Sequence, residues 1–182
     1  EDVGRLDNTI LVFLSDNGPE GSDYREADLW LRFNYSRDLE RLGGKGAYVV
    51  PGPSWASASA SPLNTFKFYA GEGGIRSPLI ISGVAGAARN QIHNGLTHVT
   101  DILPTLLDVA RVARPGASFQ GQPIEPPTGR SLVPVLADPA LRVRSADEPL
   151  GYELSGNKAL FKGDLKIALN NPPMGDGQWH LY

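Results

Sequence analysis

Two short runs of consecutive hydrophobic residues lie in the first half of the chain. Residues 9–16 (TILVFLSD) and 77–83 (SPLIISG) are rich in apolar and β-branched side chains, and polar residues or glycine end both runs. This length and composition predict strands rather than helices. Because hydrophobic positions are continuous in 9–16 instead of alternating, we expect a central strand of a parallel sheet there, covered on both faces.

A helix is predicted over residues 100–112 (TDILPTLLDVARV). Thr100 or Asp101 can cap its first turn, and Pro104 lies in that turn, where a proline is tolerated. Apolar residues recur along one face of this segment, as in a helix that packs against a core. A shorter helix is expected near residues 132–136.

The stretch from residue 18 to 61 has a largely irregular pattern and is long for a connection within a compact domain. Within it, residues 26–42 fit a helix that ends at Gly43, and residues 46–62 (GAYVVPGPSWASASASP) are rich in Gly, Pro, Ser and Ala. Long insertions near a site often form lids or binding walls. Five aromatic residues are candidates for a wall of a substrate site, with simple packing of the insertion as the alternative: Trp30, Phe33, Tyr35, Tyr48 and Trp55.

The last third of the chain has the pattern of a small sheet. Residues 113–132 are rich in Pro and Gly, which suits a crossing between domains. Residues 158–164 (KALFKGD) and 165–171 (LKIALNN) predict an antiparallel hairpin that turns at Gly163 and Asp164. Residues 178–182 (QWHLY) add a further expected strand.

Composition narrows the possible classes of protein. The 182 residues are 41% hydrophobic and 20% charged, a normal balance for a globular chain. A net charge of −3 argues against nucleic-acid binding, and no apolar stretch approaches the roughly 20 residues that cross a bilayer. The absence of cysteine excludes disulfides and thiolate metal sites. Since the chain begins at Glu1 without an initiator Met, we interpret it as part of a longer protein.

Two oxygen-bearing side chains follow the first predicted strand. Asp16 and Asn17 stand at its carboxyl end, where open α/β sheets bind ligands, and Gly18 permits a tight turn after them. A carboxylate and an amide oxygen suit Ca²⁺ or Mg²⁺, whereas zinc and copper favour His or Cys. By itself Asp-Asn-Gly is also a common turn, and both interpretations stay open at this point.

A lysine precedes a pair of glycines in residues 66–78 (FKFYAGEGGIRSP). The ammonium of Lys67 is a compact charge with three N–H donors, suited to holding a tetrahedral oxyanion such as sulfate or phosphate. Gly73 and Gly74 allow another backbone segment to come close. Taken alone, Lys67 is also explained, and more simply, as a solvated surface lysine among aromatic residues.

Taken together, these motifs resemble the sulfatase family. SDNGP is followed by K-x-x-x-x-E-G-G-I-R-x-P and then by D-x-x-P-T-L-L-D-x-A, and the whole chain is similar to the C-terminal portion of bacterial arylsulfatases. The resemblance implies an α/β fold, part of an alkaline-phosphatase-like sandwich, with a small C-terminal antiparallel-sheet subdomain. We assign residues 1–113 to the first and residues 114–182 to the second, and we leave open whether the second is truncated in this chain.

By the same resemblance, Asp16 and Asn17 correspond to two calcium ligands, with Mg²⁺ as an alternative ion. Lys67 corresponds to a catalytic lysine that binds the sulfate group. The implied partner is a small-molecule sulfate ester, with neither nucleic acid nor membrane. Asn17 stands where relatives with two zinc ions tend to carry His, and His98 is interpreted as structural. The compartment stays open between bacterial cytoplasm and periplasm, and the oligomeric state stays open too.

The family's nucleophile is a formylglycine made from Cys or Ser in C/S-x-P-x-R, and this motif is absent from the 182 residues. We therefore expect formylglycine in a missing N-terminal part. The full-length protein is then expected to be an arylsulfatase-like sulfuric ester hydrolase, and this chain alone to be inactive. Two alternatives stay open: a phosphodiesterase or phosphonate monoester hydrolase of the same superfamily, and a non-catalytic pseudoenzyme fragment.

Overall fold

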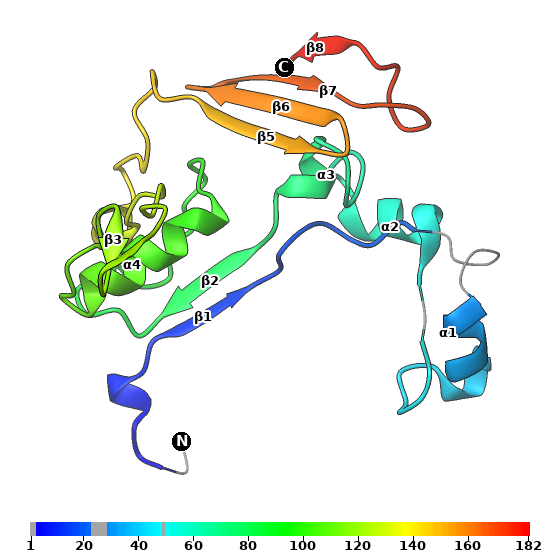
Figure 1. The fold of residues 1–182 in the computed structure, drawn as a ribbon, viewed down its shortest axis with the longest axis horizontal. Coiled ribbons are helices and arrows are strands. Elements are labelled where there is room, and N and C mark those ends of the chain that lie inside the picture. The colour runs from blue at the N-terminus through cyan, green and yellow to red at the C-terminus, as the bar shows by residue number, and fades with distance from the viewer. Residues whose placement is uncertain (1–2, 23–28, 49) are drawn as a thin grey trace. The chain divides into compact units, whose positions relative to one another are not determined.

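The computed structural model describes residues 3–22, 29–48 and 50–182. The chain divides into two compact units, each built from two separate stretches of sequence (Figure 1). Unit 1 contains Glu1–Leu14 and Leu79–Glu148, and unit 2 contains Ser15–Pro78 and Pro149–Tyr182. The division into family domains at residues 113 and 114 stays a prediction.

Unit 1 contains the two strands expected in the first half of the chain. The strands are β1, Leu11–Leu14, and β2, Leu79–Ser82, and they pair antiparallel (Figure 1). The expectation of a parallel arrangement is therefore wrong for this pair. A continuous hydrophobic run indicates that both faces of a strand can be buried, but it does not specify the direction of the neighbouring strand. Among the described residues the strands are only partly covered, since Phe13 is 67% exposed.

The helices of unit 1 match the sequence pattern. The 3₁₀ helix η3, Val99–Asp101, leads directly into α4, Ile102–Val109, and α5 spans Val133–Ala137, which confirms both expected helices. Pro104 lies in the first turn of α4 and is fully buried. The remaining elements of this unit are η1, Leu6–Asn8, and a small hairpin of β3, Ser118–Phe119, with β4, Gln122–Pro123.

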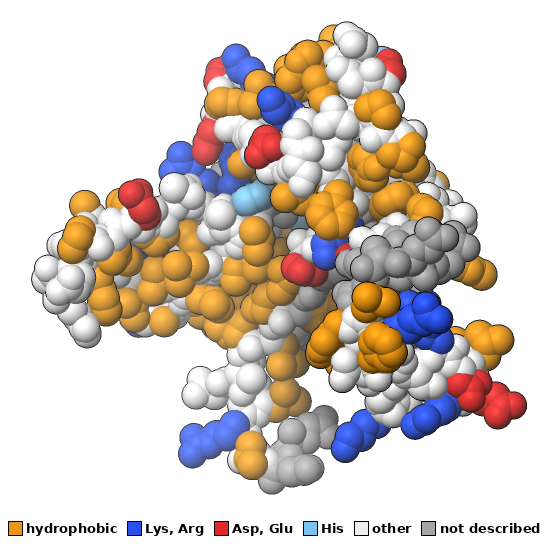
Figure 2. Space-filling view, turned by 45° about the vertical axis from the view of Figure 1, so that its right-hand side comes forward, with side chains coloured by type: hydrophobic (Ala, Val, Ile, Leu, Met, Phe, Trp, Pro, Cys, Tyr) orange, Lys and Arg blue, Asp and Glu red, His pale blue; other side chains and the backbone are white. Residues whose placement is uncertain are grey.

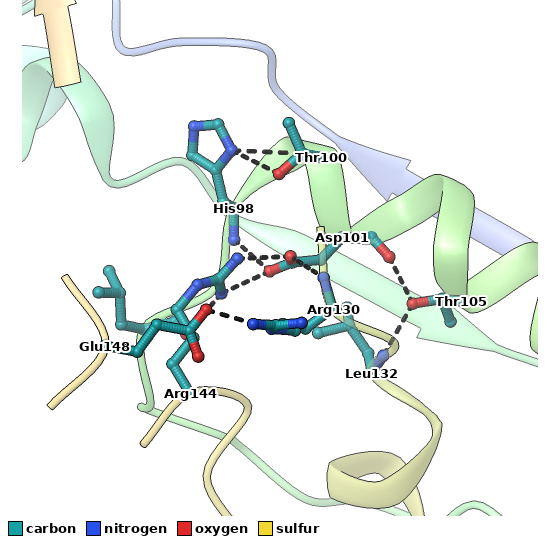
Figure 3. Close-up of polar contacts among 9 residues, drawn as sticks. His98, Thr100, Asp101, Thr105, Arg130, Leu132, Arg144 and Glu148 are labelled. Carbon is teal, nitrogen blue, oxygen red and sulfur yellow. Dashed lines mark hydrogen bonds and ion pairs between the residues drawn. The ribbon is translucent and has the colours of Figure 1, made fainter. Parts of the chain in front are cut away.

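A buried carboxylate holds the segments of unit 1 together (Figure 3). Asp101 is 0% exposed and accepts two hydrogen bonds from the guanidinium of Arg144, at 2.8 and 2.6 Å. It also accepts from the backbone N–H groups of His98 and Arg130, at 2.7 and 2.8 Å. Burial alone would raise the pKa of Asp101, but these hydrogen bonds and the Arg144 charge bring that pKa below its ordinary value.

Unit 2 contains the sheet expected at the C-terminal end. Its strands run antiparallel in the order β5-β6-β7-β8. They span Leu150–Leu154, Asn157–Lys162, Leu165–Leu169 and Trp179–Leu181, which confirms the hairpin and the last strand (Figure 1). The small core of this unit joins Ala70 to Ala159 and Ala168, with Tyr152 and Phe161 packed against them. The sheet therefore packs on the segment that follows Lys67.

The insertion in unit 2 is more helical than its pattern indicated. Residues 46–62, expected to be irregular, contain helix α2, Gly52–Ala60, because serine and alanine tolerate a helix and Pro53 lies in its first turn. The helix expected over 26–42 appears only as α1, Leu29–Asn34, and η2, Leu39–Arg41; residues 23–28 lie outside the described residues.

Three of the aromatic residues in the insertion pack on one another. The ring of Tyr35 lies 5.6 Å from that of Trp30 and 5.6 Å from that of Tyr48, between centroids. We call these three residues the aromatic cluster. Trp55, on α2, is 70% exposed. The cluster favours the packing interpretation for its own members and leaves Trp55 as a surface residue.

Many hydrophobic side chains reach the surface, as the face drawn in Figure 2 shows. Besides Phe13 and Trp55, the exposed residues include Phe33 at 81% and Ile92 at 84%. Single exposed apolar side chains are normal, whereas large contiguous apolar surfaces mark contacts with other chains or segments.

Among the helices of the described residues, none has both the length and the hydrophobicity that a bilayer crossing requires.

Candidate functional site

The two predicted metal ligands lie on the loop that follows β1. Asp16 is exposed, and Asn17 is half-buried. The Ser15 hydroxyl donates a hydrogen bond to the Asn17 carbonyl oxygen at 2.9 Å, and Asn17 Nδ2 donates to the Gly18 carbonyl oxygen at 2.9 Å. Because the NH₂ end of the Asn17 amide is used within the loop, its Oδ1 is the end that can act as a metal ligand.

The structure brings this loop against the segment that carries Lys67. The Gly18 N–H donates to the Gly74 carbonyl oxygen at 2.9 Å, and the Lys67 N–H donates to the Pro19 carbonyl oxygen at 3.0 Å. The approach is so close that a Cβ atom at residue 18 would lie 1.9 Å from the carbonyl oxygen of Gly73. The two motifs singled out in the sequence are therefore parts of one local structure, and glycine at position 18 is a steric requirement.

Lys67 forms an ion pair that sequence reasoning missed. Its Nζ lies 2.9 Å from Glu20 Oε2, and both side chains are 30% exposed. Glu20 Oε1 accepts a hydrogen bond from the Ser22 N–H at 2.8 Å. Partial burial alone would raise the pKa of Glu20, but the hydrogen bonds from Ser22 and Lys67 and the Lys67 charge lower that pKa. Glu20 thus holds the Lys67 ammonium at the chain segment that follows Asp16 and Asn17.

The C-terminal sheet supports the segment that carries Lys67. Lys166, on β7, donates to Glu72 Oε1 at 2.6 Å, and Glu72 is the first residue of α3, Glu72–Ile75. Asn170 Oδ1 accepts from the Ala70 N–H at 2.6 Å. The ion pair with Lys166 gives Glu72 a structural role in holding α3 on the sheet. Residues late in the chain therefore hold the segment just after Lys67 in place.

The donor set at the loop fits part of a calcium shell. Calcium takes six to eight oxygen ligands, and Asp16 and Asn17 offer two side chains of the right chemistry. Within residues 3–22, 29–48 and 50–182, no three or more His, Cys, Asp and Glu side chains are grouped so as to hold a metal ion. Further ligands would therefore have to come from elsewhere. The assignments of Asp16, Asn17 and Lys67 stay predictions.

His98 has a structural position. Its backbone N–H donates to the Asp101 side chain, and its own side chain accepts from the Thr100 N–H. His98 and Asp101 thereby form a capping box at the start of η3 (Figure 3). This agrees with the structural interpretation of His98. A histidine suits this position because its ring nitrogen satisfies a helix-end N–H group.

The chain is similar to known sulfatases. The family model described as Sulfatase matches residues 1–112. The chain is 35% identical over 186 residues to an uncharacterised sulfatase of Schizosaccharomyces pombe, covering 99% of this chain and 33% of that protein. It is 37% identical over 135 residues to an arylsulfatase of Klebsiella aerogenes, covering 71% of this chain and 28% of that protein. The chain thus spans about a third of the length of these curated relatives.

Two solved structures show the same fold over the full chain. Ps i-CgsB, in complex with k-i-k-neocarrahexaose, matches with a TM-score of 0.60 at 20% identity, covering 100% of this chain and 31% of that one. A protein in complex with its substrate D-glucosamine-2-N,6-O-disulfate matches with a TM-score of 0.55 at 19% identity, covering 100% and 28%. The predicted fold class, part of an alkaline-phosphatase-like α/β sandwich with a small antiparallel sheet, is confirmed. With the family model and the two sulfatase relatives, this shows that the chain belongs to the sulfatase family.

Proposed function

We propose that the complete protein containing this chain hydrolyses sulfate esters, and that this chain forms one side of its active site. The observation that carries the proposal is the packing of the Asp16 loop against the Lys67 segment, through the contacts of Gly18 with Gly74 and of Lys67 with Pro19. Membership of the sulfatase family supports the reaction type. The arylsulfatase of Klebsiella aerogenes and the sulfated glucosamine bound by one structural neighbour support a small sulfate ester as substrate.

In the proposed reaction Lys67 stabilises negative charge on the sulfate oxygens. Attack at sulfur leaves charge on these oxygens, and a fixed ammonium lowers the energy of that state without needing to reorganise. An ammonium carries three N–H donors, so contact with the anion is compatible with the 2.9 Å contact to Glu20. Glu20 would keep the ammonium oriented before the substrate arrives. It positions Lys67 and does not itself react.

Asp16 and Asn17 would supply two ligands of a bound Ca²⁺, with Mg²⁺ as the alternative. When bound, such an ion polarises sulfate oxygens as a Lewis acid. The contribution of this chain is to fix the direction of the Asn17 amide through its hydrogen bond to the Gly18 carbonyl oxygen. The motif that would encode a formylglycine is absent from the 182 residues, so the proposal requires the nucleophile to come from sequence outside them.

The test compares turnover of three substrates by the complete protein: 4-nitrophenyl sulfate, bis(4-nitrophenyl) phosphate and a phosphonate monoester. We expect the sulfate to be preferred and its turnover to fall when a chelator removes the metal ion. Lys67→Ala should lower kcat/KM for the sulfate by about a hundredfold, the usual effect of losing one stabilising contact to a developing oxyanion. Lys45→Ala, at an exposed lysine in a turn, is the matched control and should leave kcat/KM unchanged.

Other outcomes would replace this proposal. Preference for the phosphodiester or the phosphonate would assign the protein to the other branch of the superfamily. Absence of turnover of all three esters by the complete, metal-loaded protein would favour the non-catalytic alternative. Equal activities of the Lys67→Ala and Lys45→Ala variants would remove Lys67 from the site.

A further inference from the structure

A pocket of about 400 Å³ lies next to Lys67 within unit 2. The residues on either side of Lys67 in the chain line one wall of it, and the loop between β7 and β8 lines another. The side chains used below are Phe66, Phe68 and Tyr69 on the first wall and Pro172, Pro173 and Met174 on the second. Ligand pockets in proteins commonly have volumes of roughly 300–1,000 Å³, so this space is large enough for a ring of a small molecule.

Buried hydrogen bonds hold the two walls in place. Asn157, at the start of β6, is 4% exposed, and its Nδ2 donates to the Phe68 carbonyl oxygen at 2.9 Å. Its Oδ1 accepts from the Asn171 N–H at 2.8 Å. One side chain therefore joins the wall that contains Phe68 to the wall that begins after Asn171. Since both ends of the Asn157 amide are engaged, these hydrogen bonds fix the two walls relative to each other.

The backbone at the lining residue Phe68 is strained. Phe68 has a φ of 80°, in the left-handed region that bulky residues rarely adopt. The positive φ of Ser155, by contrast, belongs to the two-residue turn between β5 and β6, which it forms with Gly156. Strain of this kind concentrates at binding and catalytic positions, where the surrounding contacts maintain it. At Phe68 the maintaining contact is the hydrogen bond from Asn157 to its carbonyl oxygen.

The Phe68 ring connects the pocket to the ammonium. Its centroid lies 5.4 Å from Lys67 Nζ, and the residue is 39% exposed. Glu20 is the other partner of the ion pair. The two residues that follow it in the chain, Gly21 and Ser22, also line the pocket. A ligand whose anionic group contacts Lys67 can therefore reach the pocket with its remaining part.

The chemistry of the walls favours an apolar, planar occupant. Most lining side chains are aromatic, proline or methionine and offer carbon surface. Ser22, Ser155 and Asn171 are polar lining residues besides Asn157, whose amide is already used by the protein. Aromatic rings pack well against such groups, whereas the hydroxyl groups of a sugar need hydrogen-bond partners in order to be buried. We propose that this pocket binds the aromatic ring of an aryl sulfate whose sulfate group contacts Lys67, an inference that rests on the proposed function.

The experiment uses the complete protein and measures kcat and KM for 4-nitrophenyl sulfate and for glucose 6-sulfate, with inhibition by inorganic sulfate measured alongside. Met174→Ala and Phe68→Leu each remove apolar contact, and the second keeps a non-glycine residue at the strained position. We expect each to raise KM for the aryl sulfate about tenfold, the scale of a lost contact in an apolar pocket. Calorimetric binding of 4-nitrophenol should weaken by a similar factor. The inhibition constant of inorganic sulfate should not change.

Leu165→Ala is the matched control. Leu165 is 60% exposed on β7 and does not line the pocket, so its truncation should change neither KM nor 4-nitrophenol binding. An aryl-sulfate KM that stays the same in both pocket variants, with normal sulfate inhibition, would overturn this inference while leaving the proposed function intact. A larger rise in KM for glucose 6-sulfate than for the aryl sulfate would overturn the choice of an aromatic ring. If inorganic sulfate does not inhibit the wild-type protein, that result would instead count against the proposed function.

Discussion

The most informative stability test is replacement of Asp101 by Asn, which removes a charge from the centre of unit 1 without changing the size of the side chain. In the wild type, Asp101 is 0% exposed and Arg144 is 8% exposed, so neither charge is screened appreciably by water. The variant leaves the Arg144 guanidinium buried without its counter-charge. It also places an NH₂ group where the carboxylate accepted hydrogen bonds from N–H donors.

The expected cost follows from these contacts. Removing one partner of a buried ion pair costs about 3–5 kcal/mol of unfolding free energy, chiefly because the other charge stays buried and uncompensated. The hydrogen bonds from the His98 and Arg130 N–H groups add to the loss, since bonds to a charged acceptor contribute about 1.5–3 kcal/mol each and their contributions overlap with that of the pair. We expect a loss of at least about 3 kcal/mol.

The assay is denaturant-induced unfolding of the complete protein, followed by circular dichroism. A double-mutant cycle with Arg144→Met isolates the pair, because removing both charges should restore part of what Asp101→Asn alone loses. A cost below about 1 kcal/mol for Asp101→Asn would refute the account, since this is the usual effect of an exposed ion pair. Equal losses in the single variant Asp101→Asn and in the double variant would show that the Arg144 charge is not the cause.

The same carboxyl group predicts a pH dependence. Its pKa is lowered in the folded state, because the hydrogen bonds and the Arg144 charge outweigh the effect of burial. Its contribution to stability is therefore complete above its unfolded pKa, near pH 4, and is lost as the pH falls through the lower folded pKa. Between pH 5 and 3 the wild type should lose more unfolding free energy than Asp101→Asn. Parallel curves would contradict this assignment.

Two further predictions concern packing in unit 2. Gly18→Ala should prevent native packing of the loop and lower the melting temperature, because its Cβ would lie 1.9 Å from the Gly73 carbonyl oxygen. Gly116→Ala is the control: its Cβ would have no atom within 4 Å, so the melting temperature should stay nearly unchanged. Equal melting temperatures of the two variants would contradict the close approach. Tyr35→Ala should lower the unfolding free energy by about 1–3 kcal/mol, because it removes both ring contacts of the aromatic cluster. In the same unfolding assay Trp55→Ala should lower it by less than about 0.5 kcal/mol, because the Trp55 ring is 70% exposed. The reverse order would favour a packing role for Trp55.

Most secondary structure could be predicted from the sequence, because it depends on residues close together in the chain. The hydrophobic runs at β1 and β2, the turn at Gly163 and the apolar face of α4 are all local patterns. The motifs that resemble sulfatases are also contiguous, which is why the family and fold class were recognisable. The exceptions include α2, where a composition rich in Gly, Pro, Ser and Ala suits both loops and helices. They also include β5, which was not expected, and the helix expected over residues 26–42, of which only α1 and η2 appear.

The tertiary structure alone decided the features that join distant positions. The pairing direction of β1 depends on the path of the chain between residues 15 and 78, which the hydrophobic run does not encode. Glu20 carries no local signature, since an acidic residue after a turn is ordinary until Lys67 lies 2.9 Å away. Asn157 likewise joins the two pocket walls only because folding brings the Phe68 carbonyl oxygen and the Asn171 N–H within hydrogen-bond distance of its side chain. Local patterns specify which elements form, whereas the partners of single polar groups are determined by how those elements pack.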